Sequence, residues 1–167
     1  LVKKTSIQNG ILLISSYYFF SFWDYRFLFL LIFSTFLDFY LGGKIQNSKS
    51  IPIRKKWLTV SIVANLGFLC TFKYFNFFVS SFIQLLSKMG LEVDSWTLSI
   101  ILPIGISFYT FHGLSYVIDI YNKRITAEKK WINYSLFVSF FPLLVAGPIE
   151  RATHLLPQIR KKRFFKY

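Results

Sequence analysis

The chain has 167 residues, of which 54% are hydrophobic, 21% aromatic and only 16% charged, and its formal net charge is +13. Soluble domains are about 45–50% apolar and about one quarter charged, so this composition excludes an ordinary soluble domain. The basic residues fall mostly between the apolar runs, as in cytoplasmic loops of membrane proteins, which argues against binding to nucleic acid. Several apolar runs reach or approach the roughly 17–25 residues that cross a bilayer. The sequence therefore predicts an all-α, polytopic membrane protein.

The first part of the chain predicts two membrane-spanning helices. The apolar runs 11–23 and 27–41 are separated by the polar residues 24–26, which carry one charge of each sign. Each run is short for a full crossing, so flanking residues or local thinning of the bilayer has to help. We expect a tight turn at 24–26 between the two spans.

The middle of the chain predicts one further crossing and a bend. The gap 42–56 carries five basic residues and no acid, which is typical of a cytoplasmic loop. The apolar stretch 57–86 would be roughly 45 Å long as one helix, too long for a straight crossing of a ~30 Å hydrocarbon core. It predicts a crossing over 57–72, then a bend or a surface helix after the sequence FKYFNFF. Loop 87–97 has a slight excess of acid and is expected to lie outside.

The stretch 98–121 is long enough to return to the cytoplasmic side, and it carries a row of polar residues. If this stretch is a helix with 100° per residue, five residues lie on one face within about 80° of arc: Gly105, Tyr109, His112, Tyr116 and Asp119. A charged group at the bilayer centre costs about 2.5–3.5 kcal/mol on insertion scales, so we expect this polar row to face a bundle interior or a wet cavity. Interhelical hydrogen bonding and cavity lining explain its tyrosines equally well. Asp119, near the cytoplasmic end, is interpreted as an ion-pair partner for a basic loop.

The sequence SFFPLLVAGPIER at 139–151 is apolar but twice broken. Its breaks and its charged end are Pro142, Gly147-Pro148, Glu150 and Arg151. Loop 122–131 before it and the residues after it are both basic, so both flanks are predicted to be cytoplasmic. Irregular backbone at membrane depth is tolerated only against protein or a water-filled cavity. We expect a segment that enters and leaves by one face; an ordinary span kinked by proline is the alternative.

The chain has two histidines, His112 and His154, as candidates for a general base. Neither lies in a Ser-His-Asp order, in an HExxH motif or at Cys/His metal spacing. His154 lies four residues after Glu150, the spacing of a helical side-chain pair. The residue chemistry therefore predicts no catalytic residue and no metal site within this sequence.

Two long sequences, LPIGISFYTFHGLSYVIDIY at 102–121 and LFVSFFPLLVAGPIERATHLLPQ at 136–158, closely resemble bacterial membrane-bound O-acyltransferases. The nearer branch is that of alginate O-acetyltransferase and the D-alanine transfer protein of teichoic acid. FKYFNFF at 72–78 and FYLGGKI at 39–45 lie where that family has similar segments. By this resemblance, residues 1–167 are the N-terminal portion of one membrane domain, whose first helix and C-terminal catalytic part are missing.

The resemblance implies a multi-pass enzyme of the bacterial cytoplasmic (inner) membrane. It would move an acyl group, of the acetyl kind, from a cytoplasmic thioester to a hydroxyl of an extracytoplasmic polysaccharide or cell-envelope polymer. The donor would be acyl-CoA or an acyl-carrier protein, and no cofactor would be bound. Membrane lipid, the polymer and other envelope-acetylation proteins are the implied partners, without nucleic acid.

The same resemblance places the basic histidine of the family downstream of AGPIER, beyond this sequence, so the chain alone is expected to be inactive. The polar row would line a funnel, and the breaks at 139–151 would shape the cytoplasmic side of that funnel. Arg151 would meet an anionic donor or a lipid headgroup, with pairing to Glu150 as the simpler role. Two other classes stay open: a transporter or channel module, since broken helices and polar rows also occur there, and a non-catalytic membrane scaffold.

Overall fold

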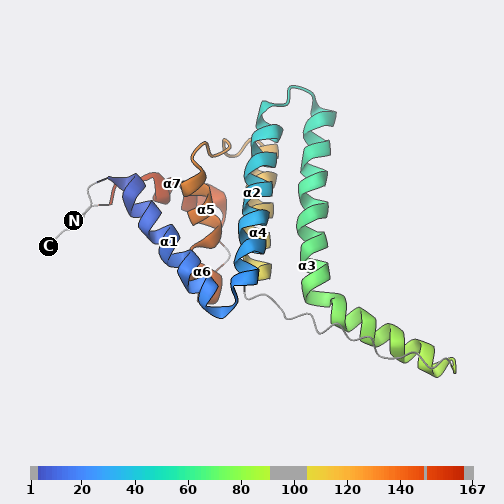
Figure 1. The fold of residues 1–167 in the computed structure, drawn as a ribbon. Helices are drawn as coiled ribbons and strands as arrows, with labels where there is room; N and C mark the ends of the chain where they lie inside the picture. Colours follow the sequence, from blue (N-terminus) through green and yellow to red (C-terminus); the bar gives the residue numbers. More distant parts are fainter. Residues whose placement is uncertain (1–3, 91–104, 149, 164–167) are drawn as a thin grey trace.

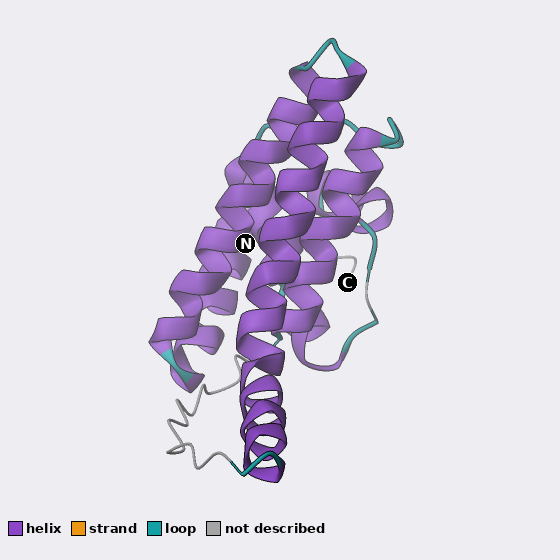
Figure 2. Ribbon diagram, turned by 90° about the vertical axis from the view of Figure 1, so that its right-hand side faces the viewer, coloured by secondary structure: helices purple, strands orange, loops and turns teal. Residues whose placement is uncertain are grey.

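A computed structural model describes residues 4–90, 105–148 and 150–163. These residues form helices and no strand, as predicted for an all-α protein. The helices are α1 (Thr5–Trp23), α2 (Tyr25–Asn47), α3 (Ile51–Lys88), α4 (Ile106–Tyr121), α5 (Trp131–Ser139), α6 (Phe141–Ala146) and α7 (Ala152–Arg160). Helix α4 packs against both α2 and α3, while α5 packs against α1, α2, α4 and α7 (Figures 1 and 2).

Two of the described helices, α2 and α3, are long and apolar enough to cross a membrane. Only 17% of the most apolar window of α3 is buried, whereas the core helix of a soluble protein would bury most of it. The apolar side chains of α3 therefore face outward, which fits a lipid environment.

The connection between α1 and α2 is shorter than predicted, because only Asp24 lies between the two helices. Asp24 is the N-cap of α2: its Oδ1 accepts a hydrogen bond of 2.9 Å from the backbone N–H of Arg26. The Arg26 guanidinium lies 2.9 Å from Oδ2. These hydrogen bonds from Arg26 lower the pKa of Asp24, so the turn carries a paired carboxylate.

The predicted loop 42–56 is wrong in extent, because α2 continues to Asn47 and α3 begins at Ile51. Pro52 lies in the first turn of α3, where a missing N–H costs nothing. Gly42 stays helical beneath Tyr116 of α4, where an added Cβ would lie 2.6 Å from the ring Cε1. Gly42 therefore marks a close approach of two helices rather than a turn, while a Cβ added at Gly43 would meet nothing within 4 Å.

Helix α3 continues for 38 residues, and Figure 1 shows that its last part turns sharply away from the bundle. The last buried residue of α3 is Leu69, and Lys73 Nζ lies 3.4 Å from Ser107 Oγ next to the start of α4. This confirms the predicted bend, while the crossing over 57–72 stays a prediction that the length and composition of α3 allow. The predicted loop 87–97 begins within α3, and its residues from 91 onward lie outside the described part, as do 98–104.

Candidate functional site

The polar row on α4 faces the interior, as predicted. Tyr109, His112, Tyr116 and Asp119 are each no more than 3% exposed, while Phe111 and Ile118 on the other side are exposed. Gly105 is the exception, because it precedes α4 as its N-cap with φ at +74°. This is left-handed backbone, which glycine adopts without steric cost. Gly105 therefore starts the helix and is not a member of its polar face.

The half of the row nearer the end of α4 is occupied by protein contacts. The Tyr116 hydroxyl accepts a hydrogen bond of 2.9 Å from the backbone N–H of Glu128. Asp119 Oδ1 lies 3.3 Å from Arg124 Nη1, which confirms its predicted pairing with a basic loop. Tyr116 and Asp119 thus fasten the loop after α4 to the helix.

The other half of the row consists of Tyr109 and His112. His112 is fully buried, with its ring centroid 5.2 Å from that of Phe137 in α5. Among the described residues, the hydroxyl of Tyr109 has no hydrogen-bond partner, while the ring of His112 lies against the backbone of Val138 in α5. Buried polar groups in native proteins are almost always satisfied by protein or by ordered water. The buried hydroxyl of Tyr109 therefore fits the lining of a wet cavity, whereas His112 contacts α5.

A second buried polar group, which we call the Asp38 cluster, was not singled out from the sequence. Asp38 of α2 is 1% exposed, and its Oδ1 accepts hydrogen bonds from Ser61 Oγ at 2.6 Å and from Asn65 Nδ2 at 2.8 Å. A Cβ added at Gly113 of α4 would lie only 2.0 Å from Asp38 Oδ2. Three helices therefore meet at one carboxyl group. A carboxylate inside the apolar run 27–41, with Ser61 and Asn65 four residues apart, was the signal in the sequence.

The segment 139–151 is broken where the sequence predicts it. Helix α5 ends at Ser139, Phe140 has extended backbone, and α6 carries Pro142 in its first turn. Gly147 ends α6, where a Cβ would lie 2.6 Å from the Cα of Leu143. Helices of nine and six residues span roughly 13 Å and 9 Å, so neither crosses a ~30 Å core by itself.

The two ends of this region meet, through what we call the closing cluster. Asn9 Nδ2 of α1 donates hydrogen bonds of 3.0 Å to Asn133 Oδ1 in α5 and to the carbonyl of Ile159 in α7. Beside it, Glu128 Oε2 lies 2.7 Å from Arg160 Nε.

Between these ends the chain extends along α1. Asn9 lies near the start of α1, whereas Phe19 lies near its end, and the ring of Phe19 is 5.3 Å from that of Phe141 in α6. Figure 1 shows α6 near the far end of α1 and α7 back near its start. The chain therefore runs into the bundle and returns to the end at which it started. This is the path expected of a re-entrant segment.

The same end of the bundle gathers the basic segments. Arg54 Nη2, near the start of α3, donates hydrogen bonds to the carbonyls of Ile120 and Tyr121 at 3.2 and 2.7 Å. The backbone N–H of Ala127 donates to the Gln46 side chain near the end of α2. The basic residues of 44–56, 122–130 and 160–163 therefore lie together. Acidic residues at this end, Asp119 and Glu128, are buried and paired with arginines.

Of the two ion pairs expected for Glu150, the structure contains the one with His154 and not the one with Arg151. His154 Nδ1 lies 2.8 Å from Glu150 Oε2, which confirms their predicted pairing. The pairing of Arg151 with Glu150 is wrong, because Arg151 is the exposed N-cap residue of α7 while the Glu150 carboxylate faces His154. Pro148 is exposed as well.

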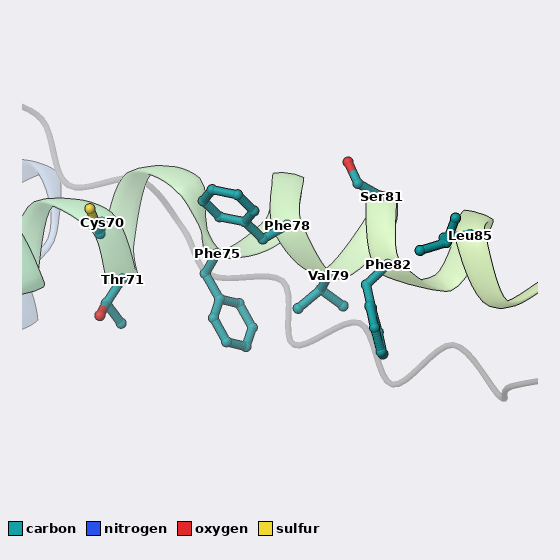
Figure 3. A pocket seen from close by; sticks show the side chains of 8 residues that line it. All are labelled: Cys70, Thr71, Phe75, Phe78, Val79, Ser81, Phe82 and Leu85. Carbon is teal, nitrogen blue, oxygen red and sulfur yellow. The ribbon is translucent and has the colours of Figure 1, made fainter.

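The described residues hold no group of three or more His, Cys, Asp or Glu side chains that could bind a metal. They do form an open groove of about 710 Å³ along the last part of α3. Figure 3 shows the side chains that line it: Cys70, Thr71, Phe75, Phe78, Val79, Ser81, Phe82 and Leu85. An apolar lining of this kind offers no acid or base for catalysis. The polar row and the segment 139–151 are therefore the better candidates for function.

No protein-family model matches the chain, and no solved structure matches it, but curated relatives do. The protein named "Probable alginate O-acetylase AlgI" of Pseudomonas syringae pv. tomato is 38% identical over 93% of this chain and 30% of its own length. Its namesake in Pseudomonas aeruginosa is 37% identical over the same shares. The peptidoglycan O-acetyltransferase of Helicobacter pylori is 31% identical over 90% of this chain and 32% of its own length.

These values define how far the similarity extends. The chain spans about 30% of the length of the relatives it matches, while the matches take in almost all of the chain itself. Over nearly its whole length, the chain is thus similar to one part of proteins named as alginate O-acetylases and as a peptidoglycan O-acetyltransferase.

Proposed function

We propose that this chain is part of an O-acetyltransferase that acetylates hydroxyl groups of an envelope polysaccharide. The observation that carries the proposal is the 38% identity over 93% of the chain to a protein named as an alginate O-acetylase. Similarity to a peptidoglycan O-acetyltransferase supports the same reaction on a different polymer. The acceptor class we assign is therefore a polysaccharide or peptidoglycan sugar hydroxyl.

In this proposal the protein is a multi-pass protein of the bacterial inner membrane, and the basic end of the bundle is its cytoplasmic end. Lysine and arginine favour the cytoplasmic side of a membrane, and 44–56, 122–130 and 160–163 lie together there. A thioester donor, acyl-CoA or an acyl-carrier protein, would approach from this side. Arg151, exposed at the N-cap of α7, is available to contact an anionic donor or a lipid headgroup.

The proposed reaction is acyl transfer without a bound cofactor. The oxygen of the acceptor hydroxyl attacks the thioester carbonyl, a C–O bond replaces the C–S bond, and the thiol leaves with the proton that the hydroxyl gives up. A general base takes that proton first. By the family resemblance this base lies outside the present sequence, so we assign Tyr109 and His112 to the lining of the hydrated path and not to proton transfer.

The re-entrant region supports this reading. A chain that runs into the bundle and returns, with its ends held by Asn9, brings irregular backbone to membrane depth. Such backbone needs protein or a water-filled cavity around it. Since the buried hydroxyl of Tyr109 has no partner among the described residues and His112 lies against α5, we propose a cavity between α4 and the segment 139–151.

The test is genetic and chemical. The gene for the full-length protein would be deleted in its source bacterium, and the O-acetyl content of purified envelope polysaccharide and peptidoglycan measured by mass spectrometry. We expect base-labile acetyl groups to be lost from one polymer and restored by the full-length gene, in the presence of the cell's other acetylation proteins. Unchanged acetylation of both polymers would contradict the proposal and favour a transporter or a scaffold.

A further inference from the structure

We propose that distal α3, residues 73–88, is an interfacial helix that lies in the plane of the membrane surface opposite the basic end. This inference rests on the membrane character of the chain and does not depend on acetyl transfer. It concerns a helical segment that exposes several large aromatic and aliphatic side chains.

Helix α3 changes its surroundings along its length. Its first part turns Ser61, Asn65 and Leu69 into the bundle. From residue 70 to 88 no residue is buried, and the rings of Phe78 and Phe82 are 63% and 60% exposed. Aromatic surface of this extent in a continuous patch marks contact with another molecule or a membrane.

Distal α3 is amphipathic. At 100° per residue, its polar residues fall within about 140° of arc: Lys73, Asn76, Ser80, Ser81, Gln84, Ser87 and Lys88. Apolar residues occupy about 180° on the opposite side: Tyr74, Phe75, Phe78, Val79, Phe82, Ile83, Leu85 and Leu86. Phe77 alone departs from this division. A helix with a wide aromatic and aliphatic face and lysines on the other lies at the lipid–water boundary.

The direction of the helix fits that location. Arg54, at the start of α3, contacts the end of α4, whereas Lys73 contacts Ser107 near the start of α4. The first part of α3 therefore extends from the basic end of the bundle to the opposite end. Figure 1 shows distal α3 turning away from the bundle at that point. A helix that leaves the bundle axis at the end of a span runs along the membrane surface.

We assign lipid as the contact of this apolar face, because the face continues the exposed apolar surface of the candidate span. The same helix exposes Val63 and Leu66 along its candidate span, so the lipid-facing surface continues from the span into distal α3. The groove in Figure 3 lies on this apolar side. Residues 73–88 contain two lysines and no acid, and both lysines lie on the polar face of the helix. Tyrosine and phenylalanine rings at this depth act as anchors.

The experiment measures where each face lies. Cysteine would be removed from the full-length protein, with Cys70→Ser in this chain, and single nitroxide labels attached after Phe78→Cys and Phe82→Cys on the apolar face. Ser80→Cys and Gln84→Cys on the polar face are the matched positions. The protein would be reconstituted in vesicles of phosphatidylethanolamine and phosphatidylglycerol. Collision with oxygen, which concentrates in lipid, and with a water-soluble nickel chelate would then be measured by electron paramagnetic resonance.

We expect the oxygen-to-nickel ratio at 78 and 82 to exceed that at 80 and 84 by about tenfold, for an apolar face buried about 5–10 Å below the headgroups. Val63→Cys in the span and Ser48→Cys in the α2–α3 connection give the lipid and water references. Equal, high nickel accessibility at all four positions would overturn the proposal in favour of a helix in water. Labels at 78 and 82 that neither reagent reaches would overturn it in favour of a protein partner, another part of the full-length protein or a second copy.

Discussion

The Asp38 cluster and the closing cluster solve different packing problems. The Asp38 cluster joins α2, α3 and α4, which follow one another along the chain, through residues 23 and 27 apart (Ser61–Asp38 and Asn65–Asp38). The closing cluster joins residues 124 and 150 apart (Asn9–Asn133 and Asn9–Ile159). The first therefore fixes a local helix arrangement, while the second closes the fold.

The difference teaches how an apolar chain chooses its interior. The free energy of an apolar side chain is similar in lipid and in a helix bundle, so burial of apolar side chains does not decide which helix faces meet. Hydrogen bonds between polar groups and close contacts at small residues decide it instead. Around Asp38 both devices occur together, because Gly113 lets α4 approach the carboxyl. In the closing cluster only the polar contacts are present, so it should be the weaker of the two.

The sharpest way to break the first region is Gly113→Ala. The new Cβ would lie 2.0 Å from Asp38 Oδ2, so the carboxyl has to move and its hydrogen bonds are disturbed. Overpacking costs about 1–3 kcal/mol and each lost bond about 1 kcal/mol. We expect the full-length protein in detergent to lose about 3 kcal/mol of unfolding free energy, measured by thermal or denaturant unfolding.

Gly67→Ala is the matched control, because its Cβ meets nothing within 4 Å; alanine there is expected to stabilise helix α3 by up to about 1 kcal/mol. Asp38→Ala should make Gly113→Ala less damaging, since the two residues share one contact. Additive effects of the two substitutions would show that the predicted clash is absent.

The second region is tested at its ion pair. Arg160→Gln leaves the carboxylate of Glu128, whose side chain is 6% exposed, without its guanidinium. We expect a loss of about 1–3 kcal/mol, the cost of an unsatisfied buried group, together with faster proteolysis after residue 160. Lys161→Gln next to it should change the stability by less than about 0.5 kcal/mol. Adding Glu128→Gln should recover part of the loss, and no recovery would argue against the pair.

A smaller effect is expected at Asn9. Asn9→Ala removes two hydrogen bonds, each worth about 0.6 kcal/mol on average between membrane helices, so the loss should be about 1 kcal/mol. Asn133→Ala in the Asn9→Ala background should add little. If the closing cluster were instead the stronger one, Asn9→Ala would cost more than Gly113→Ala, and the comparison would be reversed.

The smallest effect concerns His112, between the two regions. His112→Gln in the full-length protein keeps a polar lining group, so polymer acetylation per amount of membrane protein should fall about tenfold or less, the value of one hydrogen bond. Loss of a general base typically costs 10²–10⁴-fold. A thousandfold drop at normal abundance, inside that range, would make His112 the catalytic candidate.

Periodicity along the sequence predicted much of this architecture. The inward direction of the row from Tyr109 to Asp119 follows from spacing on one helix, and the pair His154–Glu150 from a separation of four residues. The breaks near Pro142 and Gly147-Pro148 follow from prolines, which restrict the backbone, and from a glycine, which readily leaves the helical conformation. Each of these needs only neighbours within a few turns, so the local sequence determines them.

Tertiary structure decided which glycines are turns and which are contacts. Gly42 and Gly43 look like a loop in sequence but are helical, because Tyr116 packs over Gly42. Gly105 looks like part of a helix face but caps it. The tertiary structure also decided that Asp38 accepts hydrogen bonds from Ser61 and Asn65. It likewise decided that Asn9 connects α5 and α7. Hydrogen bonds between distant segments depend on which helix faces meet, and in an apolar chain with many equivalent faces that choice exists only once the helices are assembled.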